Sequence, residues 1–330
     1  MNTYLPILIL TIVGQLSFGQ KISADNLNKC IAFCDSAKAD EIIINYKTKT
    51  IAHWKRNDYK NLQIDSASEC GSPFFKTASM VKSWTGLLIG ALIENRVIEH
   101  VDMPVCNYIP EWAAGCEKKI TIKHLLTMTA GLKRMGARGV LSQSDMNQYV
   151  LGLPTDTLPG IKFQYSNESV QLLGIIIERV THQKVDVGFE KYIFGPMDMD
   201  STTFSKDAAG NIIVFGGCTT TVGNALKVGQ LMLNTGIYNG KIIVSEQWIK
   251  ESTSPNPAAS YYGYLWWIDK NSRFWNFAAT GDLGQMTIVF PELDLILIRK
   301  QSCDLTTASK NMSWMGPKFL ELIISVVNDL

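Results

Sequence analysis

A serine and a lysine three residues apart are the pair in this sequence best suited to covalent chemistry. Ser79 and Lys82 open an apolar run that predicts a buried helix over 79–95. Helical residues three apart share one face, so the two side chains can meet. A serine hydroxyl is a weak nucleophile until a base takes its proton. A lysine can be that base if burial and the positive end of the helix lower its pKa, so the pair predicts nucleophilic catalysis.

A tyrosine and an asparagine two residues apart form a second candidate group. Tyr165 and Asn167 follow a Pro-Gly pair and open a strongly apolar segment, which predicts a helix over 167–182. A tyrosine there can relay protons between the lysine, the serine and a leaving group, while the asparagine can bind a substrate amide. The same spacing recurs at Tyr59 and Asn61, in a polar stretch that we interpret as a solvated loop.

A third candidate segment, Thr280-Gly281-Asp282, lies among short strands near the C-terminus. A glycine at the edge of a strand lets the backbone approach a ligand closely. A backbone N–H in this segment could pair with the N–H of Ser79 to hold an oxyanion. A plain β-turn explains the segment equally well when it is considered alone.

Strands are expected near both ends of the chain and helices in the middle. The patterns predict helices over 24–39, 79–95, 120–127, 144–153, 167–182, 224–234, 245–251 and 312–327, and strands over 41–47, 50–54, 261–268, 273–279, 286–290 and 293–299. The predicted fold is α+β: an antiparallel sheet built from both chain ends, flanked by helices, with an inserted, mostly helical domain. The α/β part would cover about 20–95 and 240–330 and the helical part about 96–239, with a site in the cleft between them.

Composition excludes several classes of protein. The 330 residues are 46% hydrophobic, enough for a large core, and the formal net charge is +1. No basic patch or charge run stands out, so nucleic acid is not an expected partner. The four histidines are scattered, and no spacing resembles a metal site, so neither a metal nor another cofactor is expected.

The first residues resemble an export signal. An apolar stretch over 5–14 is followed by small residues up to Gly19, which predicts a signal peptide over 1–19 and an exported, periplasmic or secreted protein. An uncleaved anchor is the alternative, although the stretch is short for a membrane span. No stable membrane span is expected once the signal is cleaved.

Seven cysteines follow this segment, and their odd number leaves at least one thiol unpaired. Cys106 and Cys116 are the best local candidates for a disulfide, and Cys30 and Cys34 could be neighbours on one helical face. Most of the seven are expected to be small buried side chains.

The three segments, in this order, resemble the serine β-lactamase and penicillin-binding superfamily, whose pattern is Ser-x-x-Lys, then Tyr-x-Asn, then a Lys/His-x-Gly strand. The resemblance is greatest to the class C β-lactamase-like serine hydrolases, which include carboxylesterases and 6-aminohexanoate-dimer hydrolases. Further similar segments extend it over about 41–299; they are 78–83, 120–132, 230–236, 262–267 and 284–290.

The resemblance implies a role for each residue of the motifs. Ser79 would be the nucleophile that forms an acyl-enzyme, and Lys82 would be the general base or its proton store. Tyr165 would share the acid–base role, and Asn167 would contact the substrate amide. Thr280 and Gly281 would occupy the last motif, and the N–H of Asp282 would be the second oxyanion donor beside that of Ser79. His124 would be structural, and no metal would be needed.

The sequence departs from the family pattern at one position. Ala279 stands where the family usually has Lys or His, a cation that helps to bind a substrate carboxylate. The expected function is therefore hydrolysis of a small-molecule ester or amide. A D-alanyl-D-alanine carboxypeptidase or β-lactamase is one alternative, and a penicillin-recognising binding or sensor protein that acylates without turnover is another. Trp266, Trp267, Trp275 and Tyr264 either shape an apolar pocket or pack in the core. The substrate and the oligomeric state stay open.

Overall fold

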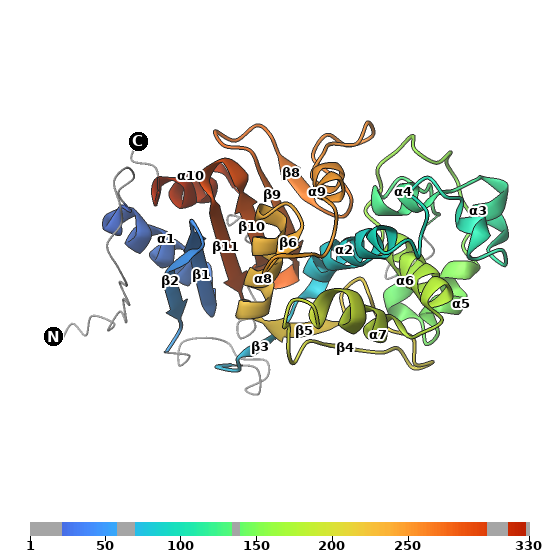
Figure 1. Cartoon of the computed structure of the whole chain (residues 1–330), viewed down its shortest axis with the longest axis horizontal. Coiled ribbons are helices and arrows are strands. Elements are labelled where there is room, and N and C mark those ends of the chain that lie inside the picture. The colour runs from blue at the N-terminus through green and yellow to red at the C-terminus, as the bar shows by residue number, and fades with distance from the viewer. Residues whose placement is uncertain (1–21, 58–69, 134–138, 302–315, 328–330) are drawn as a thin grey trace.

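Among the described residues, a six-stranded antiparallel sheet brings together strands from the N-terminal and C-terminal parts of the chain (Figure 1). The computed structural model describes residues 22–57, 70–133, 139–301 and 316–327; the expected signal segment, the Tyr59/Asn61 pair and Cys303 lie outside these residues. The sheet has the order β2-β1-β11-β10-β9-β8. Its strands are β1 (Glu41–Tyr46), β2 (Lys49–Lys55), β8 (Trp267–Asp269), β9 (Asn276–Gly281), β10 (Gln285–Phe290) and β11 (Leu295–Lys300). The predicted pairing of N-terminal with C-terminal strands is confirmed, because β1 pairs with β11.

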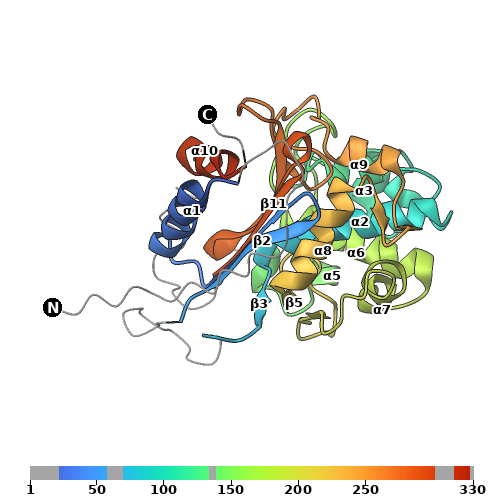
Figure 2. The same ribbon diagram turned by 60° about the vertical axis from the view of Figure 1, so that its left-hand side comes forward.

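Helices cover both faces of this sheet (Figure 2). The helices are α1 (Ala24–Ser36), α2 (Val81–Glu94), α3 (Ala113–Glu117), α4 (Ile122–Leu126), α5 (Met146–Leu151), α6 (Asn167–Thr181), α7 (Val185–Phe189), α8 (Val222–Leu233), α9 (Glu246–Ser252) and α10 (Pro317–Ser325). Helices α1 and α10 cover one face, and α8 with α2 covers the other. Neighbouring residues of one strand point to opposite faces, so Ile296 and Leu297 of β11 belong to different cores.

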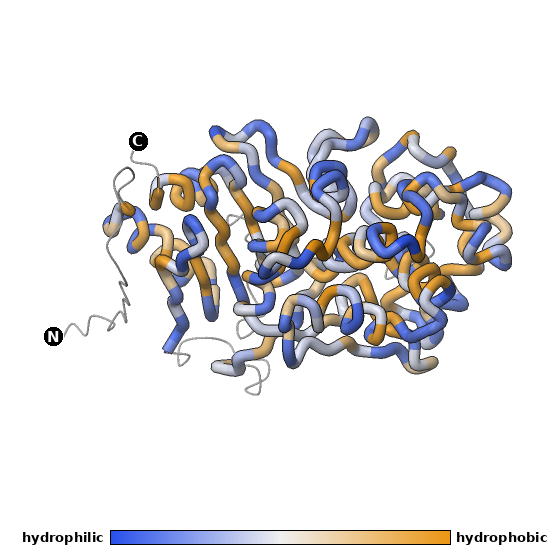
Figure 3. The backbone as a smooth tube through the Cα atoms, in the orientation of Figure 1, coloured by the Kyte–Doolittle hydropathy of each residue, from blue (hydrophilic) through white to orange (hydrophobic). Residues whose placement is uncertain are grey.

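The two strands that follow β9 in the sheet are buried along their whole length. Every residue of β10 and β11 is buried, and apolar residues follow these strands while the peripheral loops are more hydrophilic (Figure 3). Helix α2 is equally buried, from Val81 to Leu92. Both the sheet and the helix are therefore firm supports for side chains at their ends.

The middle of the chain forms a second, mostly helical region, which contains α3 to α7 (Figure 1). A small sheet of order β3-β5-β4 adjoins it, built from β3 (Phe74–Lys76), β4 (Thr203–Phe204) and β5 (Cys218–Thr221). Helix α8 packs on the large sheet, where Gly229 approaches Ile296 closely. The division of the chain near residues 95 and 240 stays a prediction.

The expected strand over 261–268 is wrong for most of its length. Only β8 is a strand there, because the chain turns before it: Leu265 adopts a left-handed φ of 61°, and its carbonyl accepts a hydrogen bond from Ser83 Oγ at 2.6 Å. Of the aromatic residues that suggested a strand, Tyr262, Tyr264 and Trp266 are buried in this turn, whereas Tyr261 is exposed. A hairpin of β6 (Ile237–Tyr238) and β7 (Lys241–Ile242) was also missed.

One disulfide agrees with the sequence. Cys106 and Cys116 are bonded, as expected. Cys30 and Cys34 are buried, unbonded thiols within hydrogen-bonding distance on α1, and Cys70 is disulfide-bonded. Within the described ranges, no helix combines the length and apolar character needed to cross a bilayer.

Candidate active site

The predicted nucleophile and its base meet at the start of α2. Ser79 lies in the short helical turn η1 (Ala78–Met80), and Lys82 lies in the first turn of α2. Lys82 Nζ is 2.7 Å from Ser79 Oγ. Ala78 has a left-handed φ of 47°, which is unusual for a residue other than glycine. Strained backbone next to a reactive side chain is typical of functional sites, because the surrounding fold must hold it in place.

The environment of Lys82 favours a neutral amine. The side chain is 1% exposed, and Nζ donates a hydrogen bond to the Phe215 carbonyl at 2.6 Å. Burial lowers the pKa of Lys82 from 10.5 to about 7, although the negative charges of Asp282 and Glu168 oppose this fall. A neutral amine offers a lone pair to the Ser79 hydroxyl, so the geometry and the charge state both suit proton abstraction.

Tyr165 reaches the same point from the other side. Its hydroxyl hydrogen-bonds the Ser79 side chain, and burial raises its pKa to about 12 despite this bond. Lys82 Nζ lies 5.1 Å from the centre of the Tyr165 ring. The ring stacks on Trp267, with centroids 5.7 Å apart, and the next residue, Ser166, caps α6 by accepting a hydrogen bond from Ser169 N–H at 3.0 Å. The tyrosine is therefore fixed by both a stack and a helix start.

The end of β9 lies against the backbone of Ser79. A Cβ atom on Gly281 would be 2.3 Å from the Thr77 carbonyl oxygen and 3.1 Å from Ser79 N, so only glycine fits. Thr280 precedes it, half-buried, and the exposed Asp282 follows it at the start of a turn. The third motif is thus beside the nucleophile, with the backbone approach expected of an oxyanion site.

Position 279, where the family usually has Lys or His, is occupied by a buried alanine. Ala279 is completely buried in the main core and lies opposite Thr287 of β10. Its small side chain leaves this face of β9 uncharged at that position. At this position the protein therefore has no side chain that could bind a substrate carboxylate, as the sequence suggested.

Two further residues have the positions that the sequence suggested. Asn167 is the first residue of α6 and is partly exposed. His124 has a structural contact, because its Nδ1 accepts a hydrogen bond from Thr121 N–H at 3.1 Å and completes a capping box at the start of α4.

Sequence reasoning missed the groups that surround the lysine. The Phe215 carbonyl orients Nζ, and a main-chain acceptor has no side-chain signature; the following Gly216-Gly217 pair was the available sign of close backbone packing. Glu168 is buried and accepts hydrogen bonds from Ser166 Oγ at 3.0 Å and Val140 N–H at 3.2 Å. Its charge acts on Lys82 from the start of α6.

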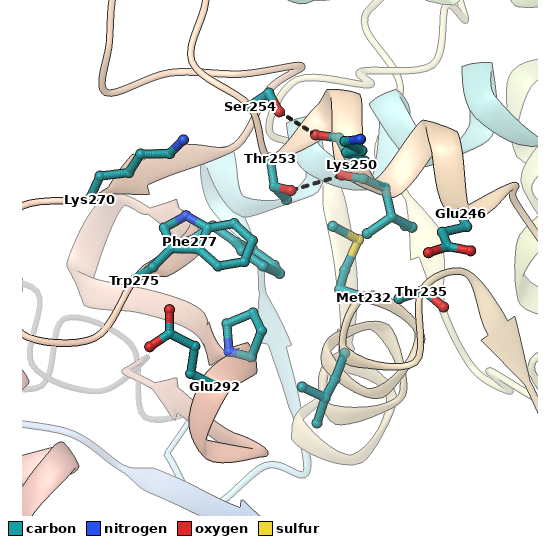
Figure 4. Close-up of a pocket in the computed structure, with 13 residues that line it drawn as sticks. Met232, Thr235, Glu246, Lys250, Thr253, Ser254, Lys270, Trp275, Phe277 and Glu292 are labelled. Carbon is teal, nitrogen blue, oxygen red and sulfur yellow. Dashed lines mark hydrogen bonds between the residues drawn. The ribbon is translucent and has the colours of Figure 1, made fainter.

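A separate cavity lies at the beginning of β9 (Figure 4). It has a volume of about 550 Å³ and none of the predicted site residues lines it. Trp275 and Phe277 form one wall and Met232 faces them. Of the aromatic residues considered above, Trp266 and Tyr264 are buried in the core, Trp275 lines this cavity, and Trp267 stacks on Tyr165. In the part of the chain that the structure describes, no cluster of His, Cys, Asp and Glu could hold a metal ion.

The fold agrees with comparisons to known proteins. The sequence profile of the Beta-lactamase family matches residues 74–300. The 6-aminohexanoate-dimer hydrolase of Paenarthrobacter ureafaciens is 26% identical over 258 residues, which cover 68% of this chain and 65% of that protein. The chain thus spans slightly less than two thirds of this relative.

Solved structures show the same architecture. A putative β-lactamase from Bacteroides dorei DSM 17855 superposes with a TM-score of 0.76 at 16% identity, over 93% of this chain and 99% of the other. A family VIII carboxylesterase superposes with a TM-score of 0.72 at 14% identity, again over 93% and 99%. At this identity the likeness concerns the fold. Since the family profile covers most of the sequence, the chain belongs to the Beta-lactamase family.

Proposed function

We propose that the protein is an exported serine hydrolase that cleaves an ester or amide bond through an acyl-enzyme on Ser79. The observation that carries the proposal is the contact of Ser79 Oγ with Lys82 Nζ at 2.7 Å, where burial lowers the pKa of the amine to about 7. The relative described above is a hydrolase by name.

The first half of the reaction forms the acyl-enzyme. Neutral Lys82 takes the Ser79 proton while Oγ attacks the substrate carbonyl carbon. The carbonyl oxygen becomes an oxyanion, held by the N–H groups of Ser79 and Asp282. The bond to the leaving group then breaks, and the leaving oxygen or nitrogen receives a proton through Tyr165. Support for this relay comes from the hydrogen bond between Tyr165 and Ser79.

The second half releases the acid. A water molecule gives a proton to the Tyr165/Lys82 pair and attacks the acyl carbon, and the Ser79–carbonyl bond breaks as Oγ regains a proton. Asn167, at the start of α6, would contact the substrate amide or carbonyl. The group that leaves and the acid that forms are both small molecules, and no step requires a metal.

The substrate class follows from Ala279. A buried alanine replaces the cation that would bind a substrate carboxylate. Uncharged esters and amides need no such partner. We therefore favour the esterase and amidase branch over β-lactam or D-Ala-D-Ala hydrolysis.

Export is part of the proposal and is supported by two features. Residues 5–14 have the apolar character of a signal segment. The disulfide between Cys106 and Cys116 suits an oxidising compartment.

Intact-mass spectrometry with two probes tests the proposal. Purified protein, Ser79→Ala and the matched control Ser83→Ala are each mixed with a short-chain activated ester and with a chromogenic cephalosporin, while product release is recorded. We expect rapid release from the ester by the wild type and by Ser83→Ala, and none above background by Ser79→Ala. Ser83 is a good control because it lies four residues further along the chain, on α2, and donates its hydrogen bond to the Leu265 carbonyl rather than to Ser79 or Lys82.

The other outcomes identify other functions. Turnover of the cephalosporin would identify a β-lactamase, and a lasting adduct without turnover would identify a penicillin-recognising binding protein. Unchanged ester hydrolysis in Ser79→Ala would remove the proposal altogether.

A further inference from the structure

A buried arginine donates hydrogen bonds to the turn that follows the third motif. Arg299 lies on β11 and is 0% exposed. Its Nη1 donates to the Gly284 carbonyl at 2.6 Å and to the Leu283 carbonyl at 3.2 Å. Both carbonyls belong to η5 (Asp282–Gly284), the turn between β9 and β10. The guanidinium thus holds the segment that begins immediately after Gly281.

This turn would not keep its shape easily without support. Leu283 and Gly284 both have left-handed backbones, with φ of 68° and 80°. Leu283 has a Cβ, so this conformation costs free energy that the surroundings must offset. The two carbonyls bound by Arg299 are those of the two left-handed residues, so the contact acts where the backbone is least stable.

The arginine is itself fixed to two other parts of the fold. Its Nη2 donates to the Ala37 carbonyl, just after α1, and to Gln301 Oε1 at 2.9 Å. Gln301 and Gln285 bond each other in both directions, through Gln301 N–H to Gln285 Oε1 at 3.0 Å and through Gln285 Nε2 to the Gln301 carbonyl. Gln285 opens β10 directly after the turn. The turn is therefore attached to the rigid sheet on both sides.

Arginine is suited to this task in a way that lysine is not. Its planar fork directs donors to several acceptors in fixed directions, whereas a lysine ammonium is a single point on a flexible stem. Burial lowers the pKa of Arg299, but a guanidinium stays charged at neutral pH. Charge-assisted hydrogen bonds are about twice as strong as neutral ones, so the bonds from Arg299 to the Leu283 and Gly284 carbonyls hold the turn strongly.

We propose that Arg299 is a positioning residue for the oxyanion site, because it fixes the turn that carries Asp282 N–H against the backbone of Ser79. This inference rests on the proposed function, which assigns that N–H to the oxyanion. Arg299 touches neither the substrate nor the reacting atoms. It fixes the turn that follows Gly281, and Gly281 itself lies close to the backbone of Thr77 and Ser79.

The role predicts a kinetic signature. A donor displaced by about 1 Å can lower a rate by about 10²-fold. Only the transition state carries the oxyanion, so Arg299→Lys and Arg299→Met are expected to lower kcat by about 10²-fold and to change KM little. Binding of phenylboronic acid, which forms a tetrahedral adduct with Ser79, should weaken in parallel with kcat/KM.

Lys300→Met is the matched control. Lys300 is the next residue on β11 and is also a buried cation, but it bonds the Ser72 carbonyl and lies 3.7 Å from Glu41, away from the turn. The Lys300→Met protein should unfold at a lower temperature, while its kcat, its KM and its affinity for the boronate stay close to those of the wild type. A further variant, Gln301→Ala, removes one acceptor of Arg299 while Arg299 stays charged, and it replaces the Arg299 variants in the test if they do not fold. A smaller fall in kcat at constant KM is expected for it.

The experiment measures ester hydrolysis, boronate affinity and thermal unfolding for all variants. Normal kcat in a folded Arg299→Lys or Gln301→Ala protein overturns the role of Arg299 and leaves the proposed function intact. An equal fall in Lys300→Met also overturns it, because the effect would then follow any lost buried cation. Absence of Ser79-dependent hydrolysis in the wild type overturns the proposed function, and this inference with it.

Discussion

Replacing Lys82 by methionine should change how the stability of the protein depends on pH. Methionine keeps most of the volume of the side chain but cannot bind a proton. In the folded wild type the amine releases its proton near pH 7, whereas the unfolded chain holds it up to about 10.5, the ordinary value. Between these values unfolding takes up a proton. The free energy of unfolding of the wild type therefore rises with pH through this window, and that of Lys82→Met lacks this contribution.

The size of the effect follows from the depressed pKa. Each pKa unit corresponds to about 1.4 kcal/mol. From pH 7 to pH 9 the wild type should gain about 2 kcal/mol over Lys82→Met, since the folded amine is already half deprotonated at the start of this interval. The mutation also leaves the Phe215 carbonyl without its donor. That cost does not depend on pH, so it cancels in the comparison.

The assay is urea unfolding of both proteins at pH 7, 8 and 9, with Lys49→Met, an exposed position on β2, as the control for loss of a lysine. We expect the stability difference between wild type and Lys82→Met to change by about 2 kcal/mol, and the difference for Lys49→Met to stay constant. A constant difference for Lys82→Met would mean that this amine keeps its proton in the folded state. The proposed base would then be protonated at neutral pH, and the reasoning would be refuted.

The same site leads to three further predictions. The kcat/KM for an ester should rise with pH and level off above about 7, as Lys82 loses its proton; a profile without an inflection between pH 6 and 8 would contradict this. Tyr165→Phe should lower kcat by about 10²-fold with an unchanged melting temperature, because the ring keeps its stack on Trp267; steady-state kinetics and thermal unfolding would show it. Replacing Cys106 and Cys116 together by serine should lower the free energy of unfolding by about 2–3 kcal/mol, since the bridge closes a loop with a separation of 10 residues; denaturant unfolding measures it, and equal stability would count against it.

Much of the fold could be predicted because its signals are local. The helices α2 and α6 carry long apolar patterns with clear starts, and the strands β1, β10 and β11 are short apolar runs between turn residues. The candidate catalytic groups sit at the starts of those helices. Three ordered motifs on recognisable elements were therefore sufficient to suggest a site before any contact was known.

The remaining features depend on contacts between distant residues. Aromatic residues before β8 suggested a strand, but the turn at Leu265 is set by hydrogen bonds to Leu126 and Ser83. The acceptor for Lys82 is the main chain of Phe215, and any residue type carries such a carbonyl. Arg299 lies in an apolar strand and gave no sign of a role, because its partners are carbonyls of a turn on another strand.

The pairing of β1 with β11 has a consequence for how the protein reaches its active form. Glu41 lies opposite Lys300 in the register, so β1 cannot pair with β11 until β11 has been synthesised. Contacts between residues so distant in sequence slow folding, because the entropy of closing a long loop is lost before the strand pairing contributes any stabilisation. A nascent chain that has not yet produced β11 cannot complete the sheet or lay β9 beside Ser79. Hydrolytic activity is therefore expected only once β11 has been synthesised and has paired with β1.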